Sequence, residues 1–103
     1  MYGPLVVSIP HRLGKQEAVR RLKSGLGSVR TNFSRVLAVQ EESWTDARLQ
    51  FRVSALGQVA HGIIDVEDDH VRLEVELPWL LARLADRIQP LIRAQGTSML
   101  EKK

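Results

Sequence analysis

Hydrophobic and polar positions along the chain follow two different periods, and the change of period divides the chain into segments. The apolar run from Leu5 to Ile9 is closed by Pro10 and predicts an edge strand, because proline donates no hydrogen bond to a ladder. From Gly14 to about Arg30 the period becomes helical. The apolar side chains of this stretch lie three and four residues apart, at Ala18, Leu22, Leu26, Val29 and Phe33.

Residues 35–77 contain four strand-like runs in which the period is two. The last two runs form the clearest hairpin, with Asp68 and Asp69 as its loop. The apolar pairs across this hairpin are Val66 with Val71, Ile64 with Leu73, Gly62 with Val75 and Ala60 with Leu77. On the other face Asp65 lies opposite Arg72. A slip of one residue would mix the two faces, so the register is well specified.

The preceding hairpin gives the same apolar face when Leu56 and Gly57 form its loop. The pairs are then Val53 with Ala60, Phe51 with Gly62 and Leu49 with Ile64. In this register Phe51 lies across Gly62 and covers the bare backbone of a strand glycine. Two independent turns that agree on one face predict a single sheet.

The first hairpin is less well determined by the pattern. A loop of residues 45–47 places Val39 and Leu37 on the apolar face, opposite Val53 and Ala55. The same loop turns Glu41 inward beside Phe51, which is unfavourable for a carboxylate. A longer loop would shift the pairs, and the register stays undecided.

The C-terminal segment returns to helical spacing. Pro78 suits the first turn of a helix that continues from Trp79. Its apolar stripe consists of Leu80, Leu81, Leu84, Ala85, Ile88, Leu91 and Ile92, with Gln95 at its end. Pro90 lies inside the stripe and is expected either to kink or to split the helix. In the first helix, Gly25 and Gly27 weaken the last turn, so the pattern does not define where that helix ends.

These segments predict one α+β domain over residues 1–103 in the order β-α-β-β-β-β-α. A single antiparallel sheet has helices packed on one face, chiefly the C-terminal one, and its other face is polar. That polar face is either solvent-exposed or covered by a second subunit in a homodimer. Ala60 and Gly62 are small where the apolar face needs volume, so the helix packs closely there or leaves a hydrophobic cleft suited to acyl chains.

Composition narrows the function classes. The chain of 103 residues has no cysteine, which excludes disulfides, thiolate nucleophiles and thiolate metal sites. No window holds enough consecutive apolar residues for a membrane span, and the N-terminus lacks the pattern of a secretory signal. We therefore expect a cytoplasmic protein.

Charge is unevenly distributed along the chain. The net charge of +3 divides into +6 over residues 1–35, −6 over residues 36–76 and +3 over residues 77–103. The first helix carries Arg20 and Arg21 beside its apolar stripe, and such cations either form a solvated face or bind an anionic partner. No nucleic-acid-binding motif accompanies them, so a nucleic-acid partner is not expected.

Candidate chemistry is sparse. Arg52, His61 and Glu76 form a row on the polar face of the sheet, and a histidine beside a carboxylate can act as a base. Ser54 is the nearest hydroxyl on that face and lies a diagonal step away, so we interpret the row as an electrostatic ladder and expect no enzyme. The acidic segment from Asp65 to His70 is interpreted as a turn rather than a cation site, and we expect no cofactor and no metal.

Several stretches taken together resemble the polyhydroxyalkanoic acid system family, whose members are small bacterial proteins encoded near genes for polyester storage granules. They are residues 7–18 (VSIPHRLGKQEA), Trp44 with residues 49–51 (LQF), residues 55–58 (ALGQ), 64–71 (IDVEDDHV), 77–81 (LPWLL) and the LEKK ending. The resemblance extends over nearly the whole chain. It implies a bacterial, granule-associated protein with an architecture similar to a reduced helix-grip fold.

The resemblance carries no catalytic or ligand residues onto this chain. It implies a non-enzymatic accessory protein of polyhydroxyalkanoate metabolism whose partner is the granule surface or a granule protein. The alternative that it leaves open is a carrier of hydroxyacyl or fatty acyl ligands in the cleft between sheet and helix. The candidate binding residues are Arg20, Arg21, Arg52, His61 and Glu76.

Overall fold

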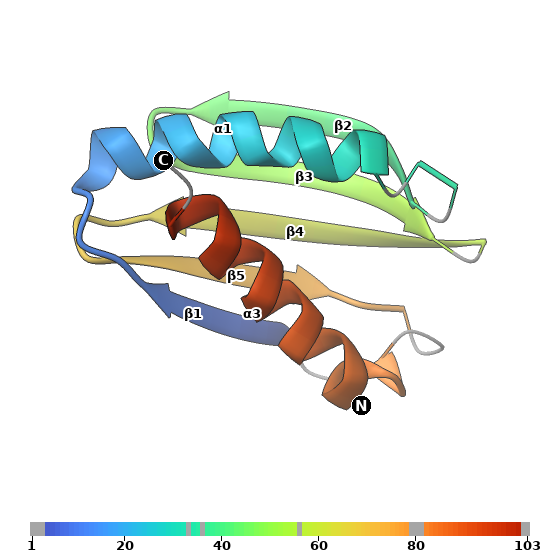
Figure 1. The fold of residues 1–103 in the computed structure, drawn as a ribbon. Coiled ribbons are helices and arrows are strands. Elements are labelled where there is room, and N and C mark those ends of the chain that lie inside the picture. The colour runs from blue at the N-terminus through green and yellow to red at the C-terminus, as the bar shows by residue number, and fades with distance from the viewer. Residues whose placement is uncertain (1–3, 33, 36, 56, 79–81, 102–103) are drawn as a thin grey trace.

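A computed structural model describes residues 4–32, 34–35, 37–55, 57–78 and 82–101. It contains one antiparallel sheet of five strands in the order β1-β5-β4-β3-β2, with two helices on one face (Figure 1). The elements are β1 (Leu5–Pro10), α1 (Lys15–Asn32), β2 (Leu37–Thr45), β3 (Arg48–Ala55), β4 (Gln58–Val66), β5 (His70–Glu76) and α3 (Ala85–Glu101). The predicted α+β class and element order are confirmed. Among the described helices, none is long and apolar enough to cross a membrane.

The registers predicted for the two later hairpins are confirmed. In β3 and β4, Phe51 pairs with Gly62, and in β4 and β5, Gly62 pairs with Val75. The predicted partner of Ala60, Leu77, lies one residue beyond the end of β5. The turn between β3 and β4 includes Gly57 at φ +75°, a backbone conformation that glycine adopts without strain. Alternation of apolar and polar residues was therefore sufficient to align three strands.

A β-bulge resolves the register of the first hairpin. Leu37 pairs with Ala55 and Val39 with Val53, as predicted, but the register shifts between Val39 and Glu41. After the shift Glu41 pairs with Arg52 on the polar face, so the carboxylate does not point inward. The extra residue of a bulge has no partner across the ladder, and its position cannot be read from a period of two.

The remainder of the first hairpin follows from that shift. Trp44 pairs with Leu49 and packs against the core. The turn is shorter than predicted, because Thr45 and Arg48 are already paired and only Asp46 and Ala47 connect them. Asp46 has φ +53°, in the left-handed region that Asp tolerates better than most residues.

Helix α1 begins directly after Gly14, whose carbonyl oxygen accepts a hydrogen bond from the Ala18 N–H at 3.1 Å. It continues through both glycines to Asn32, beyond the predicted end. The reason lies in the tertiary structure, because Gly25 faces α3. A Cβ atom placed on Gly25 would lie 3.0 Å from Met99 Cβ and closer still to Met99 Cγ. The missing side chain lets the two helices approach each other, and their packing sustains a helix that propensity alone would weaken.

Helix α3 is shorter than the predicted C-terminal helix and faces a different way. It begins at Ala85, and the predicted start at Trp79–Leu81 lies outside the described residues. Pro90 is inside the helix and does not split it. Two residues of the predicted apolar stripe, which was expected to cover the sheet, are exposed, Leu84 by 36% and Leu91 by 67%. That part of the prediction was wrong.

Contacts with β1 set the rotation of α3. A Cβ atom on Gly96 would collide with the end of Ile9, so the helix backbone lies close to the edge strand at this point. Arg93 Nη1 also donates a hydrogen bond to the Ser8 carbonyl oxygen at 2.9 Å. With this side of the helix on β1, Ile92 packs against the core, while Leu91, about 100° around the helix, points away from it.

The two helices share the apolar face of the sheet, whereas the prediction assigned it chiefly to the C-terminal one. In Figure 1, α1 lies over the β2 and β3 side and α3 crosses the β1 and β5 side. The buried residues of the helices are Ala18 and Leu22 in the first half of α1 and Leu100 at the end of α3. The buried apolar residues are Val7, Ile9, Ala18, Leu22, Leu49, Ala60, Ile64, Val66, Val71, Leu73, Val75 and Leu100.

Candidate functional site

The five predicted binding residues lie in two separate sets. Arg20 and Arg21 are on α1, whereas Arg52, His61 and Glu76 occupy neighbouring positions on β3, β4 and β5. Val53 and Ala60, next to them in sequence, lie on the helix-covered face, so alternation places the second set on the opposite face. The sheet therefore separates the two sets, and they do not form one site.

A single carboxylate pairs with both arginines of the first set. Glu17 accepts hydrogen bonds from Arg20 Nε at 2.8 Å and from Arg21 Nε at 2.8 Å. These two charge-assisted bonds, first that from Arg20, lower the pKa of Glu17 from 4.5 to about 2, and the same pair raises the pKa of Arg20. The pairs neutralise part of the basic surface that the sequence had suggested for an anionic partner.

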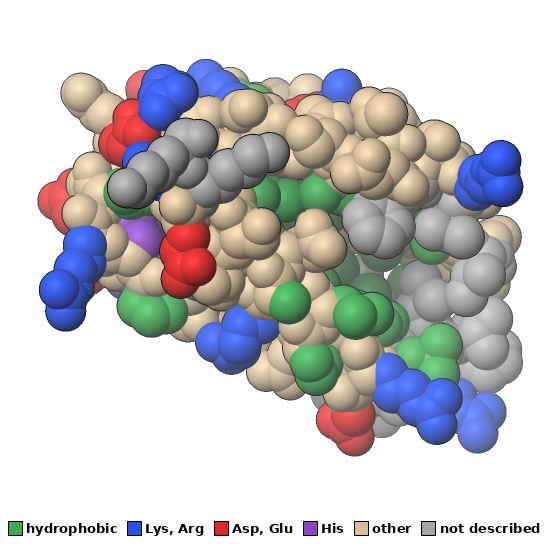
Figure 2. Space-filling model, viewed as in Figure 1, with side chains coloured by type: hydrophobic (Ala, Val, Ile, Leu, Met, Phe, Trp, Pro, Cys, Tyr) green, Lys and Arg blue, Asp and Glu red, His purple; other side chains and the backbone are tan. Residues whose placement is uncertain are grey.

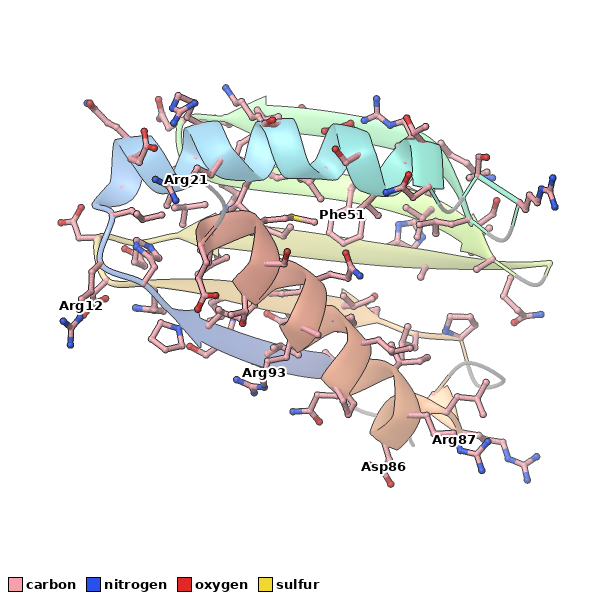
Figure 3. The ribbon with its side chains drawn as sticks, viewed as in Figure 1. Arg12, Arg21, Phe51, Asp86, Arg87 and Arg93 are labelled. Atoms are coloured by element: carbon pink, nitrogen blue, oxygen red, sulfur yellow. The ribbon has the colours of Figure 1, made fainter. Side chains whose placement is uncertain are left out.

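Arg21 also joins the two helices. Its Nη1 donates a hydrogen bond to the Leu100 carbonyl oxygen at 2.7 Å, and its side chain is only 18% exposed. Carbonyl groups in the last turn of a helix lack partners within that helix, and a cation is favoured there. Arg21 thus stabilises the docking of α3 on α1 (Figure 3). The sequence carried no signal of this role, because the two partners are 79 residues apart.

Two further cations of α1 also have partners within the protein. Lys23 Nζ lies 5.1 Å from the centre of the Trp44 ring, within the range of a cation–π interaction. Arg30 forms an ion pair with Glu42 of β2. Two of the five cations of α1 therefore contact β2, the edge strand beneath the helix.

The second set forms the row predicted on the polar face. Arg52 is adjacent to His61, and His61 to Glu76, in the strand registers. The bulge adds Glu41 to the row, and its Oε2 lies 3.4 Å from Arg52 Nη2. The His61 side chain is exposed, and no side-chain hydrogen bond of His61 occurs among the described residues. The row has the composition of a cross-strand ladder.

The remaining charges of the polar face pair differently from the prediction. Asp65 has Arg72 beside it on β5 and Arg48 beside it on β3, and its Oδ1 accepts a hydrogen bond from Arg48 Nε at 2.6 Å. That bond is the main cause of a raised pKa of Arg48. Arg72 pairs with Glu74 on its own strand at 3.0 Å. Opposite charges on this face are therefore largely paired within the sheet.

The acidic turn is tied to the loop that precedes α1. His11 Nε2 lies 3.0 Å from the Glu67 carbonyl oxygen, and the His11 N–H donates to the Asp69 carbonyl oxygen at 2.9 Å. The Lys15 N–H, in the first turn of α1, donates to Asp68 Oδ1 at 3.3 Å. His70 holds the pKa of the Asp69 carboxyl below its usual value. No group of three metal-ligating side chains occurs in the described part of the chain.

The space predicted at Gly62 is occupied by Phe51. A Cβ atom on Gly62 would lie within 2.6 Å of Phe51 Cε1, so the ring covers the glycine as the register implied. Ala60 is 4% exposed and belongs to the core. Phe51, which covers Gly62, is itself only partly buried.

The outer side of α3 has a different composition from the rest of the surface. Figure 2 shows hydrophobic side chains at the surface over the first half of this helix, with Lys or Arg side chains next to them. The exposed leucines are Leu84 and Leu91, and the exposed arginines of this region are Arg83, Arg87 and Arg93. Neither Arg83 nor Arg87 forms an ion pair with any described residue.

A comparison with protein-family models matches residues 5–100 to the model for polyhydroxyalkanoic acid system proteins. The matched stretch contains all five strands and α1, and all but the last residue of α3. No curated protein and no solved structure matches the chain.

Proposed function

Because the chain belongs to the polyhydroxyalkanoic acid system family, we propose that it is a non-enzymatic accessory protein of storage-polyester metabolism. It acts in the cytoplasm, on the granule surface or on granule proteins. The observation that carries the proposal is the family match over residues 5–100. Since that match includes the sheet and both helices, it concerns the whole folded unit rather than one motif.

The polar face supports a non-enzymatic role. A histidine base needs a nucleophile or a substrate proton within hydrogen-bond reach, and it is commonly oriented by a third group. His61 has the carboxylate of Glu76 beside it in the register, but Ser54 pairs with Val59, two positions away along the strand. Arg52 is already paired with Glu41. Electrostatic pairing across the strands accounts for the row without a reaction.

Co-sedimentation with isolated granules tests the association. The full chain is expected in the pellet when polyester granules are present, and in the supernatant of an otherwise identical lysate from cells without polymer. A distribution that stays soluble in both lysates would overturn the proposal.

The non-enzymatic part needs a separate measurement. Purified protein is incubated with amorphous polyester and with hydroxyacyl thioesters, and released acid or thiol is measured. We expect no release above the level of an inactivated sample. Turnover that the His61→Ala variant abolishes, while its unfolding curve is unchanged, would contradict this part and assign a catalytic role to the row.

A carrier of hydroxyacyl or fatty acyl ligands is the alternative function. The observation in its favour is that Phe51, Val53 and Leu77 are only partly buried, although they pack against the core. Native mass spectrometry of the purified protein would show a bound acyl ligand if the alternative is correct. The Phe51→Ala variant, which removes the ring over Gly62, would then bind more of it. Unliganded mass in both proteins would exclude the carrier.

A further inference from the structure

We propose that the outer side of α3 is the surface that contacts the polyester of the storage granule. The contact surface, here called the outer stripe, consists of Leu84, Arg87, Pro90, Leu91 and Ala94, all of which are exposed. The inference rests on the granule association proposed above and assigns that association to one surface and one partner chemistry.

The spacing of the outer stripe follows from helix geometry. Leu84 and Leu91 are seven residues apart, which is two turns, and Arg87 lies between them at three and four residues. Leu84 belongs to the same helical surface, because its carbonyl oxygen accepts the N–H groups of Arg87 and Ile88 at 2.9 Å. The two leucines and the arginine therefore lie on one continuous strip.

Exposure distinguishes these leucines from ordinary surface residues. Leu91 is 67% exposed, more than the other large hydrophobic residues that are exposed among the described ones. The outward side of a helix in a soluble domain is normally polar, because only the inward side has a core to contact. The residues of α3 that contact the core include Ile92, Met99 and Leu100, so Leu91 is additional to the packing of the domain.

Three arginines of α1 form ion pairs within the protein, whereas Arg87 of α3 forms none with the described residues. Arg20 and Arg21 pair with Glu17, and Arg30 pairs with Glu42, so these cations are engaged within the protein. Arg87 has no ion-pair partner in the described part of the chain, and Figure 3 shows it pointing outward at the start of α3. An available guanidinium presents five N–H donors and no acceptor.

A polyhydroxyalkanoate has the complementary chemistry. Its ester carbonyl groups accept hydrogen bonds, its alkyl groups are apolar, and its chain interior has no donor. Leucine side chains can bury against the alkyl groups while Arg87 donates to the ester oxygens. The five residues of the outer stripe have no side-chain acceptor, and the exposed Asp86 that precedes Arg87 forms no ion pair with it. These properties favour bare polyester as the occupant over a protein surface, which offers both donors and acceptors.

The role of the outer stripe is tested by measuring how the protein binds to lipid-free nanoparticles of amorphous polyhydroxybutyrate. The wild-type chain is expected to sediment with the particles, and the Leu84→Ser/Leu91→Ser variant to bind about tenfold or more weakly, since two apolar side chains leave the contact. The matched control is Val6→Ser/Val59→Ser. It removes two apolar side chains that are 41% and 42% exposed on the opposite face of the sheet and should leave binding unchanged.

Arg87→Gln is expected to weaken binding, whereas Arg12→Gln, an exposed arginine before α1, should not. Thermal unfolding of each variant confirms that it is folded. If the double leucine variant fails to fold, Arg87→Gln and the single Leu91→Ser variant provide the same test.

The outcomes separate this inference from the proposed function. Wild-type binding to native granules, with equal binding by the leucine variant, would place the contact elsewhere and overturn the inference alone. Binding to native granules without binding to bare polymer would also overturn it, because the partner would then be a granule protein or lipid. Absence of wild-type binding to native granules would overturn the proposed function and the inference with it.

Discussion

The contact between α1 and α3 makes opposite predictions for two glycines of the same helix. Gly25 and Gly27 are both inside α1, where replacing glycine with alanine normally stabilises a protein by about 0.5–1 kcal/mol. At Gly27 an added Cβ meets nothing within 4 Å. At Gly25 the same atom would lie 3.0 Å from Met99 Cβ and 2.8 Å from Met99 Sδ.

The gain in helix propensity and the cost of overpacking together decide whether each substitution raises or lowers the free energy of unfolding. Gly27→Ala should raise the free energy of unfolding by about 0.5–1 kcal/mol, since nothing opposes the gain in helix propensity. Gly25→Ala has the same gain but must displace Met99 near its backbone, and overpacking of this kind costs about 1–3 kcal/mol. The two variants should therefore differ by about 1–3 kcal/mol, with Gly25→Ala the less stable.

Urea unfolding followed by circular dichroism measures both free energies, and equal m-values show that the variants are compared on the same basis. Gly25→Ala introduced into a Met99→Ala background completes a double-mutant cycle. In that background the alanine should be stabilising, as it is at Gly27. If Gly25→Ala stabilises the wild-type protein as much as Gly27→Ala does, the close approach of the two helices at Met99 is refuted.

Three other predictions concern the sheet, the helix clamp and acid stability. Gly62→Ala should lower the free energy of unfolding by about 1–3 kcal/mol, because the new methyl group collides with the Phe51 ring; an unchanged urea midpoint would show that the ring moves freely. Arg21→Gln should cost about 1–2 kcal/mol through loss of the charged hydrogen bond to the Leu100 carbonyl, and faster amide exchange at the end of α3 should accompany it. The pKa of Glu17 is lowered to about 2 in the folded protein, so its contribution to stability is present above about pH 4.5 and is lost as the pH falls towards 2. Carbon-13 NMR titration of its carboxyl would contradict this assignment if the midpoint stayed near 4.5.

The sheet could be predicted largely from local pattern. Alternation over residues 49–76 was enough to pair Phe51 with Gly62 and Gly62 with Val75, since a slip by one residue would expose an entire apolar face. The first hairpin could not be aligned in this way. Its bulge between Val39 and Glu41 adds one unpaired residue, and a period of two contains no information about where such a residue falls.

The candidate site was less predictable than the fold. The row of Arg52, His61 and Glu76 was identified because strand registers place residues of three strands side by side. Which charges pair within such a face was not predictable, because long side chains choose among several neighbours. Asp65 lies between Arg48 and Arg72 in the strand registers, and it pairs with Arg48.

By itself, then, the sequence determined the α+β class, the order of the elements, the registers of two hairpins and the lack of cysteine chemistry. Those features depend on local periodicity and composition, which each segment carries alone. Only the tertiary structure decided which charges of α1 remain available and which side of α3 faces outward. Both depend on contacts between segments far apart in the chain, such as Arg21 with Leu100 and Gly96 with Ile9. Those contacts fix which side of α3 faces the sheet and leave Leu91 exposed. The proposed contact surface therefore follows from the packing of the helices and not from their sequence pattern.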